Sequence, residues 1–190
     1  MTDYFLQKQY TEISYGRDDL NLKEFEGCTF MRCNFSACSF IGVTFIDCTF
    51  TDCNFNGAKI NHVAFRTVHF NGCLMQELNF AMCDKLIFEI HFNHCNLGFA
   101  KFYTLKIKGM AFIDCSMIAV DFMKADLTEV IFDRCDLYKT VFINTILNKA
   151  DFRTSFNYTL DPEKNKVKRA MFSLENVKGL LEKHHIIVMD

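Results

Sequence analysis

A large apolar residue occupies every fifth position over most of the 190-residue chain. The first series contains twelve such residues: Phe25, Phe30, Phe35, Phe40, Phe45, Phe50, Phe55, Ile60, Phe65, Phe70, Met75 and Phe80. A second series of thirteen starts two residues out of phase: Phe92, Leu97, Phe102, Ile107, Phe112, Met117, Phe122, Leu127, Phe132, Leu137, Phe142, Leu147 and Phe152. A period of five fits neither the 3.6-residue turn of a helix nor the strict alternation of a long strand. The chain is therefore expected to bend once every five residues.

Except for Lys23, the residue two positions before each of these central residues is also small or apolar, as in Cys28, Val43 and Ala58. A spacing of two puts both side chains on the same face of a short extended segment. Asn, Thr, Asp, Ser and Lys collect at the remaining positions, which are expected to face solvent. Each five-residue unit therefore predicts one short side of a coil with a packed interior.

Five segments resemble the units of the pentapeptide-repeat family, which read Ala/Cys, Asp/Asn, Leu/Phe and two variable residues. They are CNFSA (33–37), CNFNG (53–57), ADLTE (125–129), CDLYK (135–139) and ADFRT (150–154). The resemblance covers residues 23–154. It implies an all-β solenoid, a right-handed quadrilateral parallel β-helix with four units per coil, in which residues twenty apart stack about 4.8 Å from each other. Such a rod is filled with side chains and has no internal pocket.

The chain divides into three predicted regions. Residues 1–22 keep the count of five but would place Lys8 and Asp18 inward, so an irregular amino-terminal cap is expected. Residues 23–157 form the predicted β-helix, with a break in register at 84–89. The break is expected to form an outward loop, either a binding site or a tolerated insertion. Its candidate residues are Asp84, Lys85, Leu86 and Glu89.

Residues 158–190 are expected to contain a loop, a last partial coil, a short carboxy-terminal α-helix and a strand. Ser173 suits a helix N-cap, and the helix would carry apolar residues at i, i+3 and i+7. The segment either caps the rod or pairs it with a second copy. In the Qnr-type and mycobacterial quinolone-resistance members of the family this region joins two β-helices, so the resemblance implies a homodimer. The residues concerned are Leu174, Val177, Leu181, Ile186, Ile187 and Val188.

All ten cysteines occupy the inward position two before a central residue, where they serve as small hydrophobes rather than as disulfides or zinc ligands. The spacing of twenty predicts one column of Cys33, Cys53 and Cys73 and another of Cys95, Cys115 and Cys135. The nearby His91 and His94 are expected to point outward. No phosphate loop, nucleophile elbow or HExxH motif occurs. The sequence therefore predicts a protein that is not an enzyme and has no metal site and no cofactor.

The formal net charge is only -2, which does not favour direct binding to nucleic acid or to a membrane. No secretory signal or long apolar run is present, and the protein is expected to be cytoplasmic. The resemblance implies a DNA mimic that presents carboxylates to DNA gyrase or topoisomerase IV and protects them from quinolones or toxins. The candidate carboxylates form two groups, Glu24, Glu26 and Asp47, and farther along Asp114, Asp133 and Asp151. Arg134 and Arg153 dilute the second group.

An apolar surface gives an alternative hypothesis. Tyr103, Met123 and Ile143 each follow a central residue and lie twenty apart, so they are expected to form one exposed column. Ile118 and Tyr138 form a shorter neighbouring column. Exposed apolar columns can mark a protein interface, although β-prone residues also suit a pleated surface. On this hypothesis the protein is a scaffold that binds an unrelated protein partner.

Overall fold

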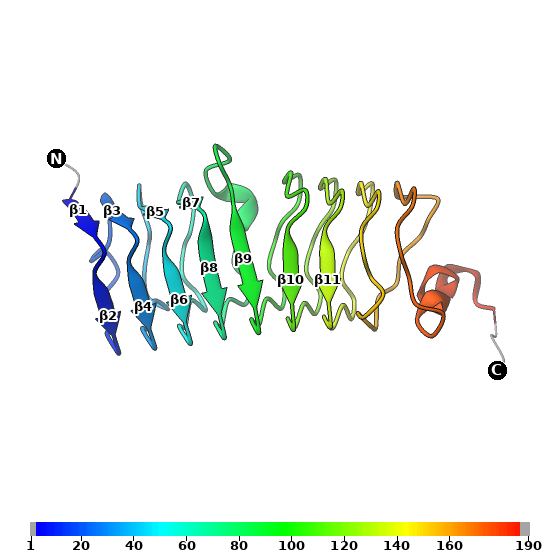
Figure 1. Ribbon diagram of the computed structural model, residues 1–190, viewed down its shortest axis with the longest axis horizontal. Helices are drawn as coiled ribbons and strands as arrows, with labels where there is room; N and C mark the ends of the chain where they lie inside the picture. The colour runs from blue at the N-terminus through cyan, green and yellow to red at the C-terminus, as the bar shows by residue number, and fades with distance from the viewer. Residues whose placement is uncertain (1–2, 187–190) are drawn as a thin grey trace.

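The computed structural model describes residues 3–186, which wind into an elongated parallel β-solenoid (Figure 1). One four-stranded sheet contains β1 (Asp3–Leu6), β3 (Lys23–Glu26), β5 (Thr44–Ile46) and β7 (Ala64–Arg66). A seven-stranded sheet contains, in spatial order, β11 (Ile131–Asp133), β10 (Ala111–Ile113), β9 (Ile90–Asn93), β8 (Val68–Asn71), β6 (Thr49–Thr51), β4 (Thr29–Met31) and β2 (Gln9–Thr11). These two sheets form two sides of the coil.

The strands pair in parallel with a register of twenty residues, as predicted from the sequence. Phe25 pairs with Phe45, and Phe45 pairs with Phe65. Single β-bridges continue the same register on the sides without named strands, for example from Lys101 to Asp121. Each central residue therefore lies directly above its equivalent in the next coil.

The corners of the coil use the left-handed backbone conformation without requiring glycine. In one coil the residues with positive φ are Gly109, Asp114, Ala119 and Lys124, spaced by five, and Glu129 takes the position of Gly109 in the next coil. Among the described residues, 24 positions with positive φ are not glycine. Their amides bond across to the next coil, as when the amide of Lys124 donates to the Ile143 carbonyl at 2.9 Å. This ladder holds each corner, and it explains how a chain with only 8 Gly turns so often.

Stacked aromatic rings fill the interior of the rod. Phe30 and Phe50 lie face to face with ring centroids 4.7 Å apart, and Phe50 stacks in turn on Phe70 at 5.0 Å. Rings of neighbouring columns meet edge to face, as Phe45 and Phe50 do at 5.1 Å and 82°. Both arrangements are favourable for aromatic pairs. The buried rings therefore form one continuous core along the described chain.

The inward position two before each central residue holds small groups whose polar atoms are satisfied by the previous coil. All ten cysteines are free and buried there. The Cys48 thiol donates to the Phe25 carbonyl at 3.3 Å, and burial raises the pKa of Cys48 to about 12. Toward the carboxy-terminal end the Thr145 hydroxyl and the Ser155 hydroxyl donate in the same way, at 3.0 and 2.8 Å. The cysteines are therefore packing groups of the core, and burial suppresses the ionisation of Cys48.

The register break adds two residues on one side of the coil, and the three following sides then pair at an offset of 22 instead of 20. Strand β8 pairs with β9 at an offset of 22, Val68 with Ile90, so two inserted residues are absorbed before β9. The intervening segment at 84–89 projects as a loop between β8 and β9 (Figure 1). Lys85 is exposed and Phe88 packs against the core instead. The inserted loop thus keeps a charge out of the interior.

The two predicted cysteine columns are in fact one. The bridges from Asn34 through Asn54, Leu74, Asn96 and Ser116 to Asp136 run without interruption across the break. The adjoining cysteines therefore stack continuously as Cys33, Cys53, Cys73, Cys95, Cys115 and Cys135. Counting twenty residues separated them, whereas the two residues inserted at the loop change the offset to 22 on the following sides of the coil, as from Leu74 to Asn96.

Residues 3–22 form a regular first coil where the sequence predicted an irregular cap. Strand β1 pairs with β3, and β2 pairs with β4, in the common register. Lys8 and Asp18 are exposed even though they occupy inward positions. Only one neighbouring coil covers them, so their charges remain solvated.

The predicted carboxy-terminal α-helix is wrong for the described residues. The segment forms two 3-10 turns, η2 (Val177–Leu180) and η3 (Glu182–His184); a third, η1 (Phe80–Met82), lies before the register break. The carbonyl of Gly179 accepts from the Leu160 amide at 3.0 Å instead of from an amide one helical turn later. A Cβ on residue 179 would overlap the Tyr158 carbonyl. The contact of this glycine with the last coil therefore replaces the hydrogen bonds that an α-helix would form here.

Candidate interaction surfaces

The predicted apolar column is present on the outer surface. Tyr103 is half-buried, while Met123 and Ile143 are 36% and 39% exposed. Hydrogen bonds from the corner amides to the next coil align the column. For example, the Thr104 amide donates to the Met123 carbonyl at 2.9 Å. The Asn79 side-chain amide lies 3.5 Å from the Tyr103 hydroxyl. These contacts give the column a fixed backbone and a partly exposed apolar surface.

The shorter column lies on the next corner. Ile118 is half-buried and Tyr138 is 48% exposed. The Lys139 ammonium lies 5.1 Å from the centre of the Tyr138 ring, within the range of a cation–π contact. Phe99, which the sequence analysis did not single out, is 55% exposed between these columns at a corner with φ of 61°. The sequence offered one indication of this exposure: Phe99 stands two positions after a central residue, where a side chain cannot face inward.

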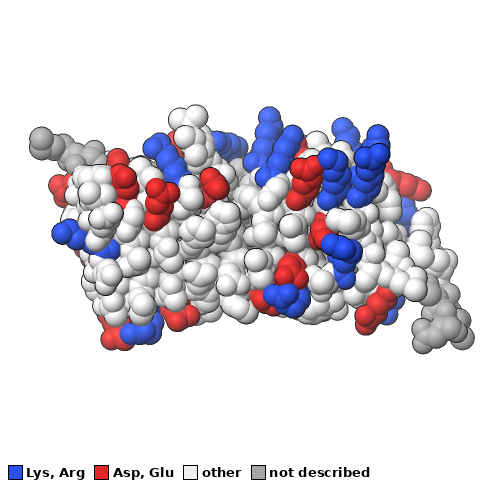
Figure 2. Space-filling view, in the orientation of Figure 1, with Lys and Arg blue, Asp and Glu red and all other residues white. Residues whose placement is uncertain are grey.

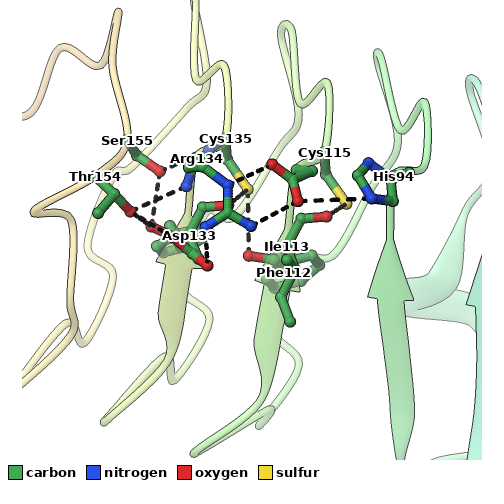
Figure 3. A network of polar contacts seen from close by, with 11 residues as sticks. His94, Phe112, Ile113, Cys115, Asp133, Arg134, Cys135, Thr154 and Ser155 are labelled. Atoms are coloured by element: carbon green, nitrogen blue, oxygen red, sulfur yellow. Dashed lines mark hydrogen bonds and ion pairs between the residues drawn. The ribbon is translucent and has the colours of Figure 1, made fainter.

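The second group of carboxylates is neutralised within the chain. Arg134 donates from Nε and Nη2 to both carboxylate oxygens of Asp114, at 2.6 and 2.7 Å, and from Nη1 to Asp133 at 2.7 Å. Figure 3 shows this guanidinium between neighbouring coils, with the Thr154 hydroxyl donating to Asp133 at 2.9 Å. The hydrogen bond from Arg134 lowers the pKa of Asp114. Asp114 is therefore held ionised, and neither Asp114 nor Asp133 is free to meet a basic partner.

Asp151 is neutralised in the same way. Both of its carboxylate oxygens accept from Arg153, with Nη2 to Oδ2 at 2.8 Å, and this hydrogen bond lowers the pKa of Asp151. Such exposed ion pairs stabilise a fold only weakly. Their main effect here is on the charge of the surface, because the two arginines neutralise the carboxylates of the predicted acidic group.

Replacing Arg134 with Gln should restore an acidic surface at this position. The pKa of Asp114 is expected to return toward its ordinary value, because its main hydrogen-bond donor is lost. A depressed carboxyl pKa stabilises the folded protein above the unfolded-state pKa, and this contribution is lost as pH falls through the folded pKa. The variant should therefore lose less stability on acidification than the parent. An NMR titration of the Asp114 carboxyl carbon checks the shift, and Arg32→Gln, which removes the distant Glu12 pair, should leave it unchanged.

The amino-terminal carboxylates are less constrained. Glu24 and Glu26 lie half-buried on β3, on either side of Phe25, and Asp47 is exposed at the corner after β5. Glu26 accepts a hydrogen bond from the Tyr4 hydroxyl at 2.6 Å, which raises the pKa of Tyr4 to about 12. Within the described chain neither Glu24 nor Asp47 has a basic side chain within 4.0 Å. This group is the part of the predicted acidic surface that remains available.

The loop and the carboxy-terminal segment expose apolar residues. Leu86 is 69% exposed, and its amide donates to the Asp84 carboxylate at 2.7 Å. Leu174 is 92% exposed, Val177 is half-buried, and Leu181 and Ile186 are exposed. Ile187 and Val188, predicted for the same assembly surface, lie outside the described residues. Leu180, which was not predicted, packs against the core.

No cluster of three or more His, Cys, Asp or Glu side chains suited to a metal ion occurs in the part of the chain that the structure describes. His91 stacks on His69 with ring centroids 4.5 Å apart, and His94 lies 3.7 Å from Asp114. Cys95 is buried, so it does not converge with these imidazoles. Over residues 3–186, no helix is long and apolar enough to cross a membrane.

Two family descriptions match the sequence, a pentapeptide repeat region over residues 23–102 and pentapeptide repeats over residues 121–155. The chain belongs to the pentapeptide-repeat family. Its fold is similar to that of a trypsin-treated form of QnrB1, a plasmid-mediated fluoroquinolone resistance protein, with a TM-score of 0.80 at 13% identity over all of both chains. HetL from the cyanobacterium Nostoc, involved in heterocyst differentiation regulation, matches at a TM-score of 0.37 and 11% identity, covering 91% of this chain and 87% of its own. No curated protein matches the chain by sequence.

Proposed function

We propose that this pentapeptide-repeat protein is a non-catalytic, cytoplasmic rod that binds a protein partner through the column of Tyr103, Met123 and Ile143. The exposed column is the observation that carries the proposal. Its apolar side chains lie on a backbone fixed by the corner hydrogen bonds, so little ordering is needed on binding. Apolar and aromatic side chains dominate the energetics of protein interfaces. Asp114 and Asp133, on another side of the coil, are already paired and do not compete as a recognition surface.

Replacing Met123 with Asp should abolish partner binding without unfolding the rod, because the side chain is solvent-accessible. The experiment is affinity capture with the parent, with Met123→Asp and with the matched control Met31→Asp, whose side chain is similarly exposed on β4. A partner of the column is retained by the parent and by Met31→Asp, and is lost with Met123→Asp. Equal retention by all three proteins contradicts a role for the column.

A type II topoisomerase, DNA gyrase or topoisomerase IV, is the second candidate partner. The observation in its favour is the whole-chain similarity in fold to QnrB1, supported by the unpaired carboxylates of Glu24 and Asp47. On this proposal the rod acts as a DNA mimic that protects the enzyme from quinolones or toxins, with the loop at 84–89 as an additional contact. Supercoiling by gyrase is measured across a concentration series of the protein, with and without a quinolone.

Restored supercoiling in the presence of the quinolone supports the topoisomerase proposal. In that case the double variant Arg134→Gln and Arg153→Gln, which frees three carboxylates, should act at a lower concentration than the parent. If the protein has no effect on supercoiling at any concentration, the topoisomerase proposal is contradicted, and binding of another protein through the apolar column is the proposal that stands.

The carboxy-terminal segment is proposed to join two copies end to end. Leu174 and Leu181 are exposed on the turns that close the last coil, where a second copy would cover them. Leu174→Asp should convert a dimer to a monomer in sedimentation velocity while leaving the circular dichroism spectrum unchanged. A parent protein that is monomeric at all concentrations contradicts this part of the proposal.

A further inference from the structure

The side of the rod that carries β1, β3, β5 and β7 changes charge along its length. After the loop the same side continues through Lys106, Asp126, Ile146 and Lys166, which are joined by β-bridges. Seven exposed basic residues lie on or border this part, and together they are called the basic edge: Lys106, Lys108, Lys124, Lys149, Lys166, Lys168 and Arg169. Figure 2 shows Lys and Arg side chains gathered along this edge, while Asp and Glu dominate near the other end.

Most of the basic edge is not neutralised within the chain. Lys108 pairs with Asp126 at 3.1 Å, and Lys149 pairs with Glu129 at 2.5 Å. Within residues 3–186 the other five cations have no carboxylate oxygen within 4.0 Å. The sequence total of -2 therefore conceals a local excess of positive charge on one side of one half of the rod.

The loop places two apolar side chains next to this positive charge. Leu86 and Ile87 are 69% and 62% exposed at its tip. Ile87 has φ of 57° and is the only aliphatic β-branched residue among the described non-glycine residues with positive φ. That conformation is unfavourable for such a side chain, and its exposure to water is unfavourable as well. The tip projects from the same edge as the cations, as Figures 1 and 2 show together.

A hollow of about 360 Å³ separates the loop from the following coil. Ile87 and Phe88 line one wall, and His91, Lys106 and Lys108 contribute polar heads together with Glu89, whose carboxylate lies 3.5 Å from His91. No β-bridge within the described chain joins Lys106 to the loop, whereas Lys106 is bridged to Asp126 on its other side. The hollow thus combines apolar surface with cations that can meet an anionic group.

We propose that the loop tip and the basic edge together dock this protein on an anionic phospholipid surface. Leu86 and Ile87 enter the boundary between headgroups and acyl chains, and the cations meet lipid phosphates. Peripheral attachment needs two such signals, because one small apolar insertion or one basic patch binds weakly by itself. The formal net charge of -2, from which no membrane partner was predicted, hides this local excess of positive charge. A nucleic acid would also bind the cations, but it would leave the exposed apolar side chains of the loop tip without a contact. The inference is independent of the proposed protein partner.

Fluorescence gives a direct test because the chain contains no Trp. Leu86→Trp introduces a single reporter at the loop tip, and Ile41→Trp introduces a matched reporter at a site that is 57% exposed and lies outside the loop. Vesicles contain either equal parts of phosphatidylglycerol and phosphatidylcholine or phosphatidylcholine alone. The emission of Leu86→Trp is expected to shift to shorter wavelength only with the anionic vesicles. Absence of this shift, or an equal shift for Ile41→Trp, overturns the proposal.

Vesicle sedimentation tests the basic edge. The double variant Lys166→Ala and Lys168→Ala should partition about thirtyfold more weakly into anionic vesicles, since each lysine near the surface contributes about fivefold. The matched double variant Lys8→Ala and Lys59→Ala removes two exposed lysines elsewhere and should partition like the parent. Added salt should weaken binding of the parent.

A parallel titration with a duplex oligonucleotide distinguishes the competing ligand class. Binding to the duplex that depends on Lys166 and Lys168, does not change in Leu86→Asp, and exceeds binding to anionic vesicles overturns the lipid assignment in favour of nucleic acid. Equal binding of the parent to phosphatidylcholine vesicles overturns the role of the cations.

Discussion

Replacing Phe122 with Asp is expected to unfold the solenoid. The Phe122 side chain is fully buried and stacks between Phe102 and Phe142, with ring centroids 5.2 and 5.7 Å away. Removing a buried aromatic ring costs about 3–5 kcal/mol. An unpaired carboxyl group in the same place adds a further penalty, because no polar partner is available in this column of rings. The sum is comparable with the about 5–15 kcal/mol that stabilises a typical domain.

The measurement is the soluble yield of each protein and its urea unfolding curve followed by circular dichroism. Phe122→Leu is the control, because it keeps an apolar side chain in the column and should cost far less. A soluble Phe122→Asp protein with the stability of the parent would show that this position does not face inward, and would overturn the assignment of the five-residue frame.

The second large effect is expected for Gly179→Ala. Gly179 is the point at which the carboxy-terminal turns meet the last coil, and an added Cβ would overlap the Tyr158 carbonyl. Backbone rather than a flexible side chain must move, and overpacking of this kind costs about 1–3 kcal/mol. The hydrogen bond from Leu160 to Gly179 should break, which exposes Tyr158 and Phe172 at the end of the core.

Loss of the hydrogen bond from the Leu160 amide to Gly179 is measured directly by the hydrogen exchange of that amide. It should become much faster in Gly179→Ala, whereas exchange in the central strands should change little, because each coil contacts only its neighbours. Gly98→Ala is the control, since a Cβ at that position would meet mainly the Asn96 side chain at 3.3 Å and ordinary contacts beyond it. An unchanged Leu160 amide in Gly179→Ala would mean that the turn does not close the core.

The repeat made most of the fold predictable. A large apolar residue at every fifth position specifies which side chains face inward, and the structure buries Phe25 through Phe80 as expected. The exposed column of Tyr103, Met123 and Ile143 follows from the same count. The carboxylate surface was less predictable, because the sequence placed Asp114 and Arg134 twenty residues apart without showing that their side chains form a bidentate pair.

The wrong predictions concern places where the period gives no information. Apolar spacing after Ser173 favoured an α-helix, but close packing of Gly179 on Tyr158 directs the segment into 3-10 turns. The count of twenty split one cysteine column into two, since a loop on one side of the coil changes the offset on another. Lys8 and Asp18 suggested irregularity, although the first coil lacks a second neighbour and leaves them solvated.

The sequence by itself determined the five-residue unit, the parallel stacking of coils and the filled interior. These follow from local alternation and from burial of a repeated apolar side chain, which act in the same way at every unit. Tertiary structure alone decided which charges cancel, where the loop projects and how the carboxy-terminal turns dock. Those properties depend on residues about twenty positions apart being brought within a few ångströms, and no local pattern encodes the direction in which their side chains then meet.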